Sequence, residues 1–85
     1  MDRSEISGTI KSYLESEYPV SGVELTGETN LLEEWFVDSI AIVNTVVFLE
    51  KQFGIRIVRA DINANTFRNL DALTDHVMRR LGEKA

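Results

Sequence analysis

The sequence of 85 residues contains no cysteine, a single proline and a single histidine. Without cysteine the chain forms no disulfide, binds no metal through thiolates and has no cysteine nucleophile, so a reducing compartment is allowed. No apolar run approaches the length of a membrane span, and the first ten residues have neither a basic start nor a hydrophobic signal segment. We therefore expect a cytoplasmic protein that does not bind membranes.

Basic residues are absent from the middle of the chain. Between Ser12 and Glu50 the sequence has eight acidic residues and no lysine or arginine, and the formal net charge of the whole chain is −5. Nucleic acid is not an expected partner, because phosphate backbones are bound by clustered basic faces. The acidity forms either a solvated surface or a patch that attracts a basic enzyme.

The length and the few chemically reactive residues also limit the possible functions. With 44% hydrophobic residues the chain fills one core, so we expect one domain over residues 1–85. A hydrolase triad is not expected, because Asp38 adjoins Ser39 and cannot also orient the imidazole of His76. His76 is interpreted as a surface side chain. The acidic residues lack the spacing of a metal-binding loop, so no metal is expected.

The hydrophobic pattern predicts a first helix followed by a long loop. Asp2 and Glu5 have the spacing of a capping box, and apolar residues then recur on one helical face until Pro19. These residues are Ile6, Ile10, Tyr13, Leu14 and Tyr18. Residues 21–30 are rich in Gly, Ser, Thr and Glu, which predicts a surface loop. The residues expected to hold this loop are Val23, Leu25, Leu31 and Leu32.

A second helix is predicted up to Phe53, with Asp38 or Ser39 as N-cap and Gly54 as C-terminal stop. Its expected core face consists of Ile42, Thr45, Val46, Leu49 and Phe53. Three further apolar residues lie beside that face: Ile40, Val43 and Val47. The apolar arc is therefore wider than the roughly 100° that a surface helix needs to face a core. Either the bundle buries the whole arc, or part of it meets a partner.

The remainder of the chain predicts one more long helix. Residues 55–58 indicate an extended segment with Ile55 and Ile57 buried, since four residues without a partner strand cannot form a sheet. One short helical turn is expected within residues 61–67. The last helix is expected to begin after Asn69 as N-cap and to end at Gly82. Its inward residues are predicted to be Leu70, Leu73, Val77 and Leu81.

These features together resemble a known family. The run NLLEEWFVDSIAIVNTVVFLEKQFGIRI, followed by Asp61 and by TFRNLDAL, is similar to the acyl and peptidyl carrier proteins, most of all to the free-standing kind. The resemblance covers residues 30 to about 81. It depends on Asp-Ser-Ile with two leucines upstream, on Phe-Gly-Ile fourteen residues after Ser39, and on Phe67. Met1 and the short tails also favour a free-standing carrier.

The resemblance implies an all-α four-helix bundle with a long loop between the first two helices and a short third helix. It also implies that 4′-phosphopantetheine is esterified to the Ser39 hydroxyl, and that the protein holds acyl or aminoacyl groups as thioesters without being an enzyme. A phosphodiester suits the N-terminal end of a helix, where backbone N–H groups and the helix dipole favour an anion. Asp38 is expected to help a phosphopantetheinyl transferase hold its metal.

The resemblance also indicates a partner-binding face on the second helix. Its expected members are Ile40, Val43, Asn44, Val47 and Lys51, of which the apolar ones are interpreted as docking residues. The expected partners of this monomer are the phosphopantetheinyl transferase, a ligase that activates acyl or aminoacyl groups, and downstream acyl-processing enzymes.

Two departures from the family affect the expected cargo and surface. Ala41, Asn44 and Lys51 stand where fatty-acid carriers commonly have an acidic residue, which favours specialised biosynthesis over bulk fatty-acid synthesis. Trp35 and Phe36 stand where a glycine is usual, and their rings either pack in the core or form a contact surface next to the prosthetic arm. A fatty-acid-type carrier and a non-catalytic helical adaptor remain the alternatives.

Overall fold

The computed structural model describes residues 2–18, 22, 24–36 and 38–84, the last two of them without their side chains. These parts of the chain form helices and loops and contain no strand. The three long helices have 15 residues each: α1 (Arg3–Glu17), α3 (Ser39–Phe53) and α5 (Leu70–Lys84). The shorter elements are α2 (Leu31–Glu34), the 3₁₀ turn η1 (Arg59–Asp61) and α4 (Ala64–Phe67). The prediction of an all-α bundle is confirmed, whereas α2 was not predicted.

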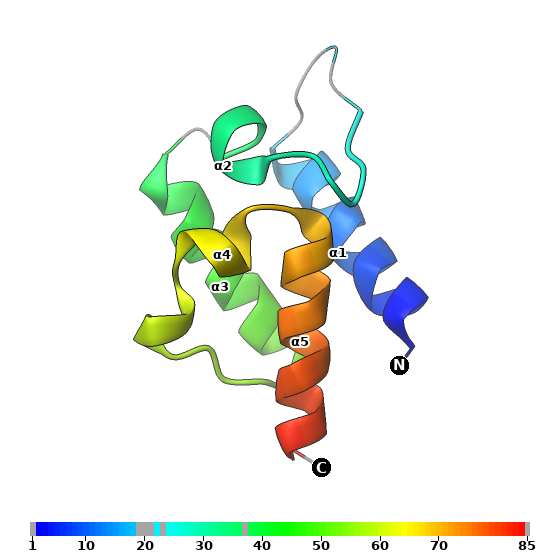
Figure 1. Ribbon diagram of the computed structural model, residues 1–85, viewed down its shortest axis with the longest axis vertical. Coiled ribbons are helices and arrows are strands. Elements are labelled where there is room, and N and C mark those ends of the chain that lie inside the picture. The colour runs from blue at the N-terminus through cyan, green and yellow to red at the C-terminus, as the bar shows by residue number, and fades with distance from the viewer. Residues whose placement is uncertain (1, 19–21, 23, 37, 85) are drawn as a thin grey trace.

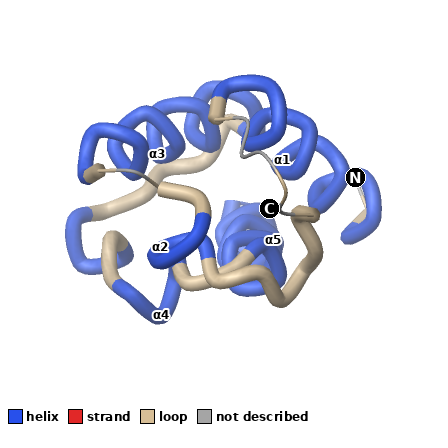
Figure 2. Tube along the Cα trace, turned by 90° about the horizontal axis from the view of Figure 1, so that it is seen from above, coloured by secondary structure: helices blue, strands red, loops and turns tan. Residues whose placement is uncertain are grey.

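The long helices form two layers. Figure 1 shows α5 in front, with α3 on one side of it and α1 on the other. Seen from above in Figure 2, α1 and α3 lie next to each other along one side of the molecule, and α5 lies against them on the other side. Since α5 contacts α1, α3 and α4, it is the central helix of the bundle.

Asp and Asn side chains begin the five helices. In each case the side-chain oxygen accepts the backbone N–H three residues later, which satisfies one of the unpaired donors at the helix start. The N-caps are Asp2, Asn30, Asp38, Asn63 and Asn69, with N···O distances of 2.9, 3.1, 3.1, 3.0 and 2.7 Å. The predicted caps Asp2 and Asn69 are confirmed, and Asp38 rather than Ser39 caps α3.

The ends of the helices agree only in part with the predictions. Gly54 ends α3 as predicted, with φ at +64°, a left-handed conformation that glycine adopts without steric cost. The prediction that Gly82 ends the last helix is wrong: α5 continues to Lys84, and Gly82 has no positive φ. The proline proposed to stop the first helix, Pro19, lies outside the described residues.

The loop before α2 is fastened to the junction between α4 and α5. The N–H of Leu31 donates to the carbonyl of Arg68 at 2.7 Å, and the N–H of Asp71 donates to the carbonyl of Gly27 at 3.0 Å. A Cβ atom on residue 27 would collide with the Asp71 carboxylate, so a larger residue here would force that exposed side chain to move. Leu25 is buried, as predicted. Val23, which was expected to help hold the loop, lies outside the described residues.

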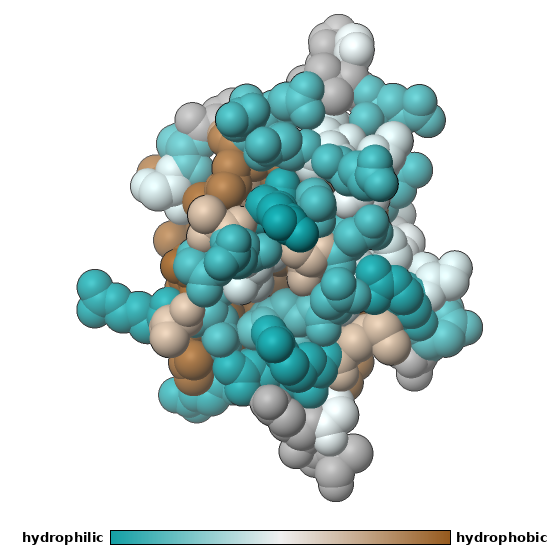
Figure 3. Space-filling model, viewed as in Figure 1, coloured by the Kyte–Doolittle hydropathy of each residue, from teal (hydrophilic) through white to brown (hydrophobic). Residues whose placement is uncertain are grey.

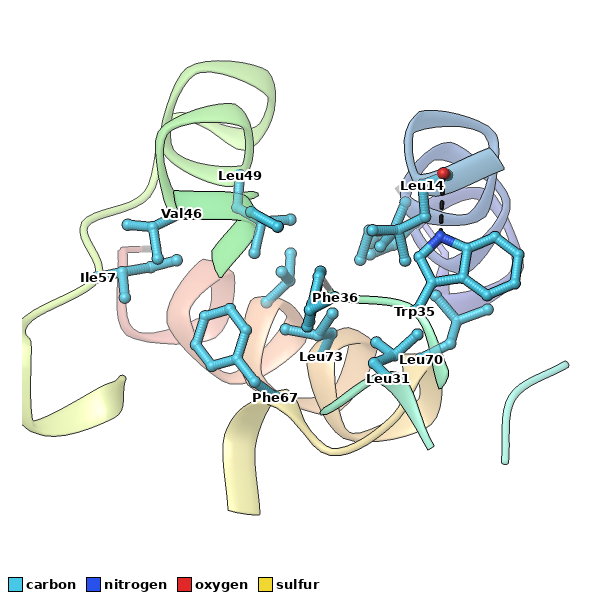
Figure 4. Close-up of a cluster of buried hydrophobic side chains, with 14 of the residues drawn as sticks. Leu14, Leu31, Trp35, Phe36, Val46, Leu49, Ile57, Phe67, Leu70 and Leu73 are labelled. Atoms are coloured by element: carbon cyan, nitrogen blue, oxygen red, sulfur yellow. Dashed lines mark hydrogen bonds between the residues drawn. The ribbon is translucent and has the colours of Figure 1, made fainter. Parts of the chain in front are cut away.

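The hydrophobic core lies between α5 and the other helices. Figure 4 shows labelled core residues from all of these elements: Leu14, Leu31, Trp35, Phe36, Val46, Leu49, Ile57, Phe67, Leu70 and Leu73. The indole N–H of Trp35 donates to the carbonyl of Leu14 at 3.1 Å, which satisfies the polar atom of this ring. The inward residues predicted for the first and last helices are confirmed in the cases of Ile6, Ile10, Leu14, Leu70, Leu73 and Val77.

Residues 54–63, here called the connector, run from the end of α3 to the start of α4. Ile55 and Ile57 are buried in it, as predicted. The N–H of Ile57 donates to Glu50 Oε2 at 3.0 Å, so the connector is tied back to α3 near its beginning. Its far end contains η1 and leads into α4, where Phe67 is buried.

Candidate functional site

Ser39 is the first residue of α3, and its side chain is exposed. The preceding residue, Asp38, is extended and uses its carboxylate Oδ1 to accept the N–H of Ala41. Because Asp38 fills the capping role, the Ser39 hydroxyl is not needed for it. The structure therefore places a serine hydroxyl in solvent at the N-terminal end of a 15-residue helix.

This position fits a phosphodiester. The backbone N–H groups of a first helical turn point away from the helix, and the helix dipole is positive at this end, so both would stabilise an anion attached to Ser39. The neighbouring Asp38 carboxylate is exposed, and its Oδ1 accepts the N–H of Ala41. The first turn of α3 has no lysine or arginine, so a phosphate attached to Ser39 would depend on backbone donors and water.

The outer side of α3 is apolar. Ile40, Val43 and Val47 are 65%, 57% and 43% exposed, and Asn44 and Lys51 are exposed beside them. These five residues are called the exposed face of α3. In Figure 3 hydrophobic residues gather along one edge of the molecule, over α3 and the connector, whereas the side formed by α5 is mainly polar. The predicted exposure of Val43 and Val47 is confirmed.

Aromatic residues border the exposed face of α3 on the side of α1. Asn44 Nδ2 donates to the hydroxyl of Tyr18 at 3.1 Å, a contact that the sequence did not predict. Tyr18 meets Tyr13 edge to face, and Tyr13 stacks on Phe48 with ring centroids 3.9 Å apart. Burial, followed by the neighbouring Tyr18, raises the pKa of Tyr13 to about 12. Tyr13 is therefore neutral at physiological pH.

An apolar cavity of about 170 Å³ lies between α2, α3 and α4. It is lined by Leu32, Ile42, Ile62, Asn63, Ala64 and Phe67. Ile42 follows Ser39 by one helical turn, and it is half-buried here instead of lying fully in the core as predicted. The cavity therefore adjoins the first turns of the helix that begins with Ser39.

The structure decides between the two alternatives for Trp35 and Phe36, and it corrects the interpretation of Ala41. Trp35 and Phe36 are only 3% and 8% exposed, so they belong to the core and do not form a contact surface next to the arm. The turn of α2 directs both rings inward. Ala41 is 1% exposed, and its carbonyl accepts a hydrogen bond from the buried Thr45 hydroxyl at 2.8 Å. Position 41 is therefore not part of the surface, and its lack of an acidic residue says nothing about docking. Only Asn44 and Lys51 differ from fatty-acid carriers at exposed positions.

His76 was expected on the surface, but it is only 2% exposed. Its Nε2 lies 3.6 Å from Asp61 Oδ2, and the same oxygen accepts a hydrogen bond from Arg80. Burial alone would raise the pKa of the Asp61 carboxyl, but the Arg80 hydrogen bond, the Val58 N–H and the nearby His76 together lower it from its ordinary value of 3.8. Position could have revealed the burial, because residue 76 follows the inward Leu73 by three residues.

Metal ions and membranes have no evident binding element in the described parts of the chain. Within residues 2–18, 22, 24–36 and 38–84, no three Asp, Glu or His side chains gather in a way that could hold a metal ion. None of the helices described has the length and apolar character needed to cross a membrane.

Comparison with known proteins identifies relatives of this chain. Residues 8–77 match the family model described as "Phosphopantetheine attachment site". The acyl carrier protein of Thermotoga maritima is 25% identical over 80 residues, which cover 94% of this chain and 96% of that protein.

A solved structure also shares the fold. It is a chain in the crystal structure of the Bradyrhizobium japonicum glycine:[carrier protein] ligase complexed with glycylated carrier protein, with a TM-score of 0.64 and 21% sequence identity. The similarity covers 88% of this chain and 96% of that chain. Because the family model matches most of the sequence, including Asp38 and Ser39, the chain belongs to the phosphopantetheine-binding carrier proteins, which are non-catalytic and carry 4′-phosphopantetheine covalently.

Proposed function

We propose that Ser39 is the attachment residue and that the protein works as a single-domain, monomeric carrier of acyl or aminoacyl groups in the cytoplasm. The observation that carries this proposal is the exposed Ser39 hydroxyl at the N-terminus of α3, with Asp38 acting as the cap. The prosthetic arm supplies the thiol that holds the acyl group as a thioester. The chain itself contains no cysteine that could compete for the acyl group.

Asp38 has a second role in this proposal. One of its carboxylate oxygens accepts the N–H of Ala41, and the side chain is exposed, so its other oxygen can reach a metal ion held by the phosphopantetheinyl transferase. Hard cations such as Mg²⁺ prefer carboxylate oxygen ligands. The same residue then orients the first turn of α3 and presents Ser39 to the transferase.

The exposed face of α3 is the proposed docking surface for partner enzymes. Three apolar side chains are exposed together on this one helix, whereas the core residues are well buried. A patch of exposed apolar residues marks a binding surface more often than a single exposed apolar residue does. The face begins one residue after Ser39. An enzyme that docks on it therefore has the prosthetic arm within reach.

The proposed cargo is an amino acid or a small carboxylic acid that a discrete ATP-dependent ligase loads for specialised biosynthesis. The fold similarity to a carrier protein glycylated by its ligase supports this cargo. Asn44 and Lys51 on the exposed face also support this cargo. They stand where fatty-acid carriers commonly have acidic residues, which attract the basic docking patches of fatty-acid enzymes. Downstream acyl-processing enzymes would then take the group from the arm.

A fatty-acyl carrier is the second candidate, and the apolar cavity beside Ile42 favours it. At about 170 Å³ the cavity has the liquid volume of about six water molecules. In this conformation it fits a short acyl group, so a long chain would require the bundle to open. The similarity to an acyl carrier protein over almost the whole chain also supports this candidate.

The attachment is tested by incubating the protein with coenzyme A and a broad-specificity phosphopantetheinyl transferase and measuring intact mass. We expect a mass increase of one phosphopantetheine unit in the wild type and none in Ser39→Ala. Ser16→Ala, which removes an exposed serine from α1, is the matched control and should be modified normally. A wild type that stays unmodified with several transferases would reject Ser39 as the attachment residue and favour the adaptor alternative.

The cargo is tested with the modified protein. It is offered to amino-acid ligases and to acyl ligases with ATP, and the loaded thioester is read by intact mass. The proposal expects loading by an amino-acid or small-acid ligase. Elongation of a malonyl-loaded form by fatty-acid synthase enzymes, at rates equal to those of a housekeeping carrier, would instead select the fatty-acyl alternative.

A further inference from the structure

Three side chains meet where the connector passes α5. Arg80 donates to Asp61 Oδ2, and His76 Nε2 lies 3.6 Å from the same oxygen. The side chains of Arg80 and Asp61 are 25% and 17% exposed, and that of His76 is 2% exposed. Behind them, Arg79 Nη2 lies 3.1 Å from His76 Nδ1. An ion pair that is largely shielded from water, with further hydrogen bonds to its members, restrains structure more than an exposed pair does.

Asp61 also organises the connector itself. Its Oδ2 accepts the N–H of Val58 at 3.3 Å, and its carbonyl accepts the N–H of Asn63 at 3.1 Å. Asn63 in turn accepts the N–H of Thr66 and so begins α4. A continuous series of contacts therefore runs from α5 through Asp61 to the first turn of α4.

The residues that follow Asp61 form a wall of the apolar cavity. Ile62 and Asn63 line it together with Ile42 of α3, and Ile62 is 42% exposed, so its side chain borders both the cavity and solvent. Neighbouring Cα atoms are about 3.8 Å apart along the chain, so a displacement of Asp61 necessarily displaces Ile62. The backbone N–H groups of Asp61 and Ile62 donate to the carbonyls of Val58 and Arg59, so these hydrogen bonds lie within the connector and not between it and α5.

We propose that Asp61 and Arg80 form a latch that holds the connector on α5 and keeps Ile62 in place as the wall of the cavity beside α3. When the pair separates, the connector between Val58 and Asn63 leaves α5 and the mouth of the cavity, which is already partly open, widens. Asp61 and Arg80 are thus positioning residues for the cavity. The group that enters the opened cavity depends on the proposed function, whereas the latch itself does not.

The latch is tested on the unmodified full-length protein by residue-resolved amide hydrogen exchange. Asp61→Asn keeps the size of the side chain but removes its charge, and Arg80→Gln removes the partner. Each variant should exchange the Ile62 and Asn63 amides about tenfold faster than the wild type, with little change in α1, because opening is local. The double variant should show no further acceleration, since each single change already breaks the pair.

The matched control is Asp75→Asn on the same helix, α5. It removes the exposed ion pair that Asp75 forms with Arg3 of α1. It should leave exchange in the connector unchanged. Arg80→Lys keeps the charge and should give an intermediate acceleration of exchange. This milder variant can be measured even if Asp61→Asn or Arg80→Gln does not fold. Equal acceleration in α1 and in the connector would show general destabilisation and would overturn the latch, as would unchanged exchange in all variants.

A second measurement addresses the cavity directly. The δ1-methyl resonances of Ile42 and Ile62 are followed while 1-hexanol is added as a small apolar probe. We expect Asp61→Asn to bind the probe at least about threefold more tightly than the wild type or Asp75→Asn, because the opened state is already populated. Equal affinity in all three proteins would contradict the proposal. Modification of Ser39 should proceed normally in Asp61→Asn, so a failed latch and a failed attachment site are distinguished.

Discussion

α3 and α5 have the same length and begin in the same way, but they present different surfaces to solvent. Asp38 and Asn69 cap them with the same hydrogen bond, and each helix contains a buried threonine that donates to the carbonyl four residues earlier. On its outer side α5 has Asp71, Asp75 and Arg79 with a partly exposed Met78, whereas α3 has three exposed apolar residues.

The difference separates what the fold needs from what the function uses. α5 shows that a central helix of this bundle can be stable with a charged outer side. The exposed Ile40, Val43 and Val47 of α3 are therefore not required for helix formation or for the core. Apolar residues that the fold does not need, on the helix that begins with Ser39, support the proposed docking surface.

The largest difference in folding stability between the two helices is expected when a core residue of α5 is shortened. Leu73→Ala should lower the free energy of unfolding by about 2 to 5 kcal/mol, because Leu73 is fully buried and the change leaves a cavity. Val43→Ala on the outer side of α3 should change it by less than about 0.5 kcal/mol. Urea denaturation of both variants measures the two effects. A large loss from Val43→Ala would mean that the exposed face of α3 is packed in solution.

The next change tests the outer side of α3 in function. Val47→Asp should reduce transfer between the loaded carrier and its partner enzymes by about tenfold, as expected for a charge placed in an apolar contact. Its thermal stability should stay close to that of the wild type, since Val47 is 43% exposed. Met78→Asp, at a partly exposed apolar residue of α5, is the control and should transfer normally. Equal losses in both variants would remove the special role of α3.

A smaller effect is expected from the two matched caps. Asp38→Ala and Asn69→Ala each remove one side-chain hydrogen bond at a helix start and should cost about 1 kcal/mol of folding stability. Only Asp38→Ala should also slow the attachment of phosphopantetheine to Ser39. Denaturation curves and a modification time course measure the two properties. Normal modification of Asp38→Ala would confine this residue to capping.

The smallest effect concerns pH. The pKa of Asp61 is lowered in the folded protein, so its charge stabilises the fold at pH above the ordinary value of 3.8, and this stabilisation is lost as the pH falls through the lowered value. The stability difference between the wild type and Asp61→Asn should therefore shrink as the pH falls from about 5 to about 2. Denaturation at several pH values measures it. A constant difference over this range would contradict the lowered pKa.

Much of the fold could be predicted because the long helices have clear periodicity and side-chain caps. Ser39, Asp38 and the exposed Val43 and Val47 followed from the same pattern together with the family resemblance. α2 was missed because a helix of four residues within a loop has no repeating apolar pattern. The inward turn of Trp35 and Phe36 depends on that helix, so their burial could not be decided from the sequence.

The cluster around Asp61 could not be predicted for a different reason. Asp61 and Arg80 are 19 residues apart, and the contact depends on how the connector lies on α5, which no local pattern specifies. His76 was placed on the surface because of its polar side chain, although its position three residues after Leu73 indicates the inner side of the helix. In this case the position in the helix was a better guide than the residue type.

Trp35 gives the protein a natural fluorescent probe. It is the single tryptophan of the chain, its indole is buried where α2 meets α1, and its N–H is bonded to the Leu14 carbonyl. An indole shielded from water emits at shorter wavelengths than a hydrated one, so unfolding will shift the emission to the red. Since this ring is buried in the core, a substitution in the exposed face of α3 that weakens docking alone should leave the emission unchanged. Loss of binding and loss of fold can thus be told apart without any label.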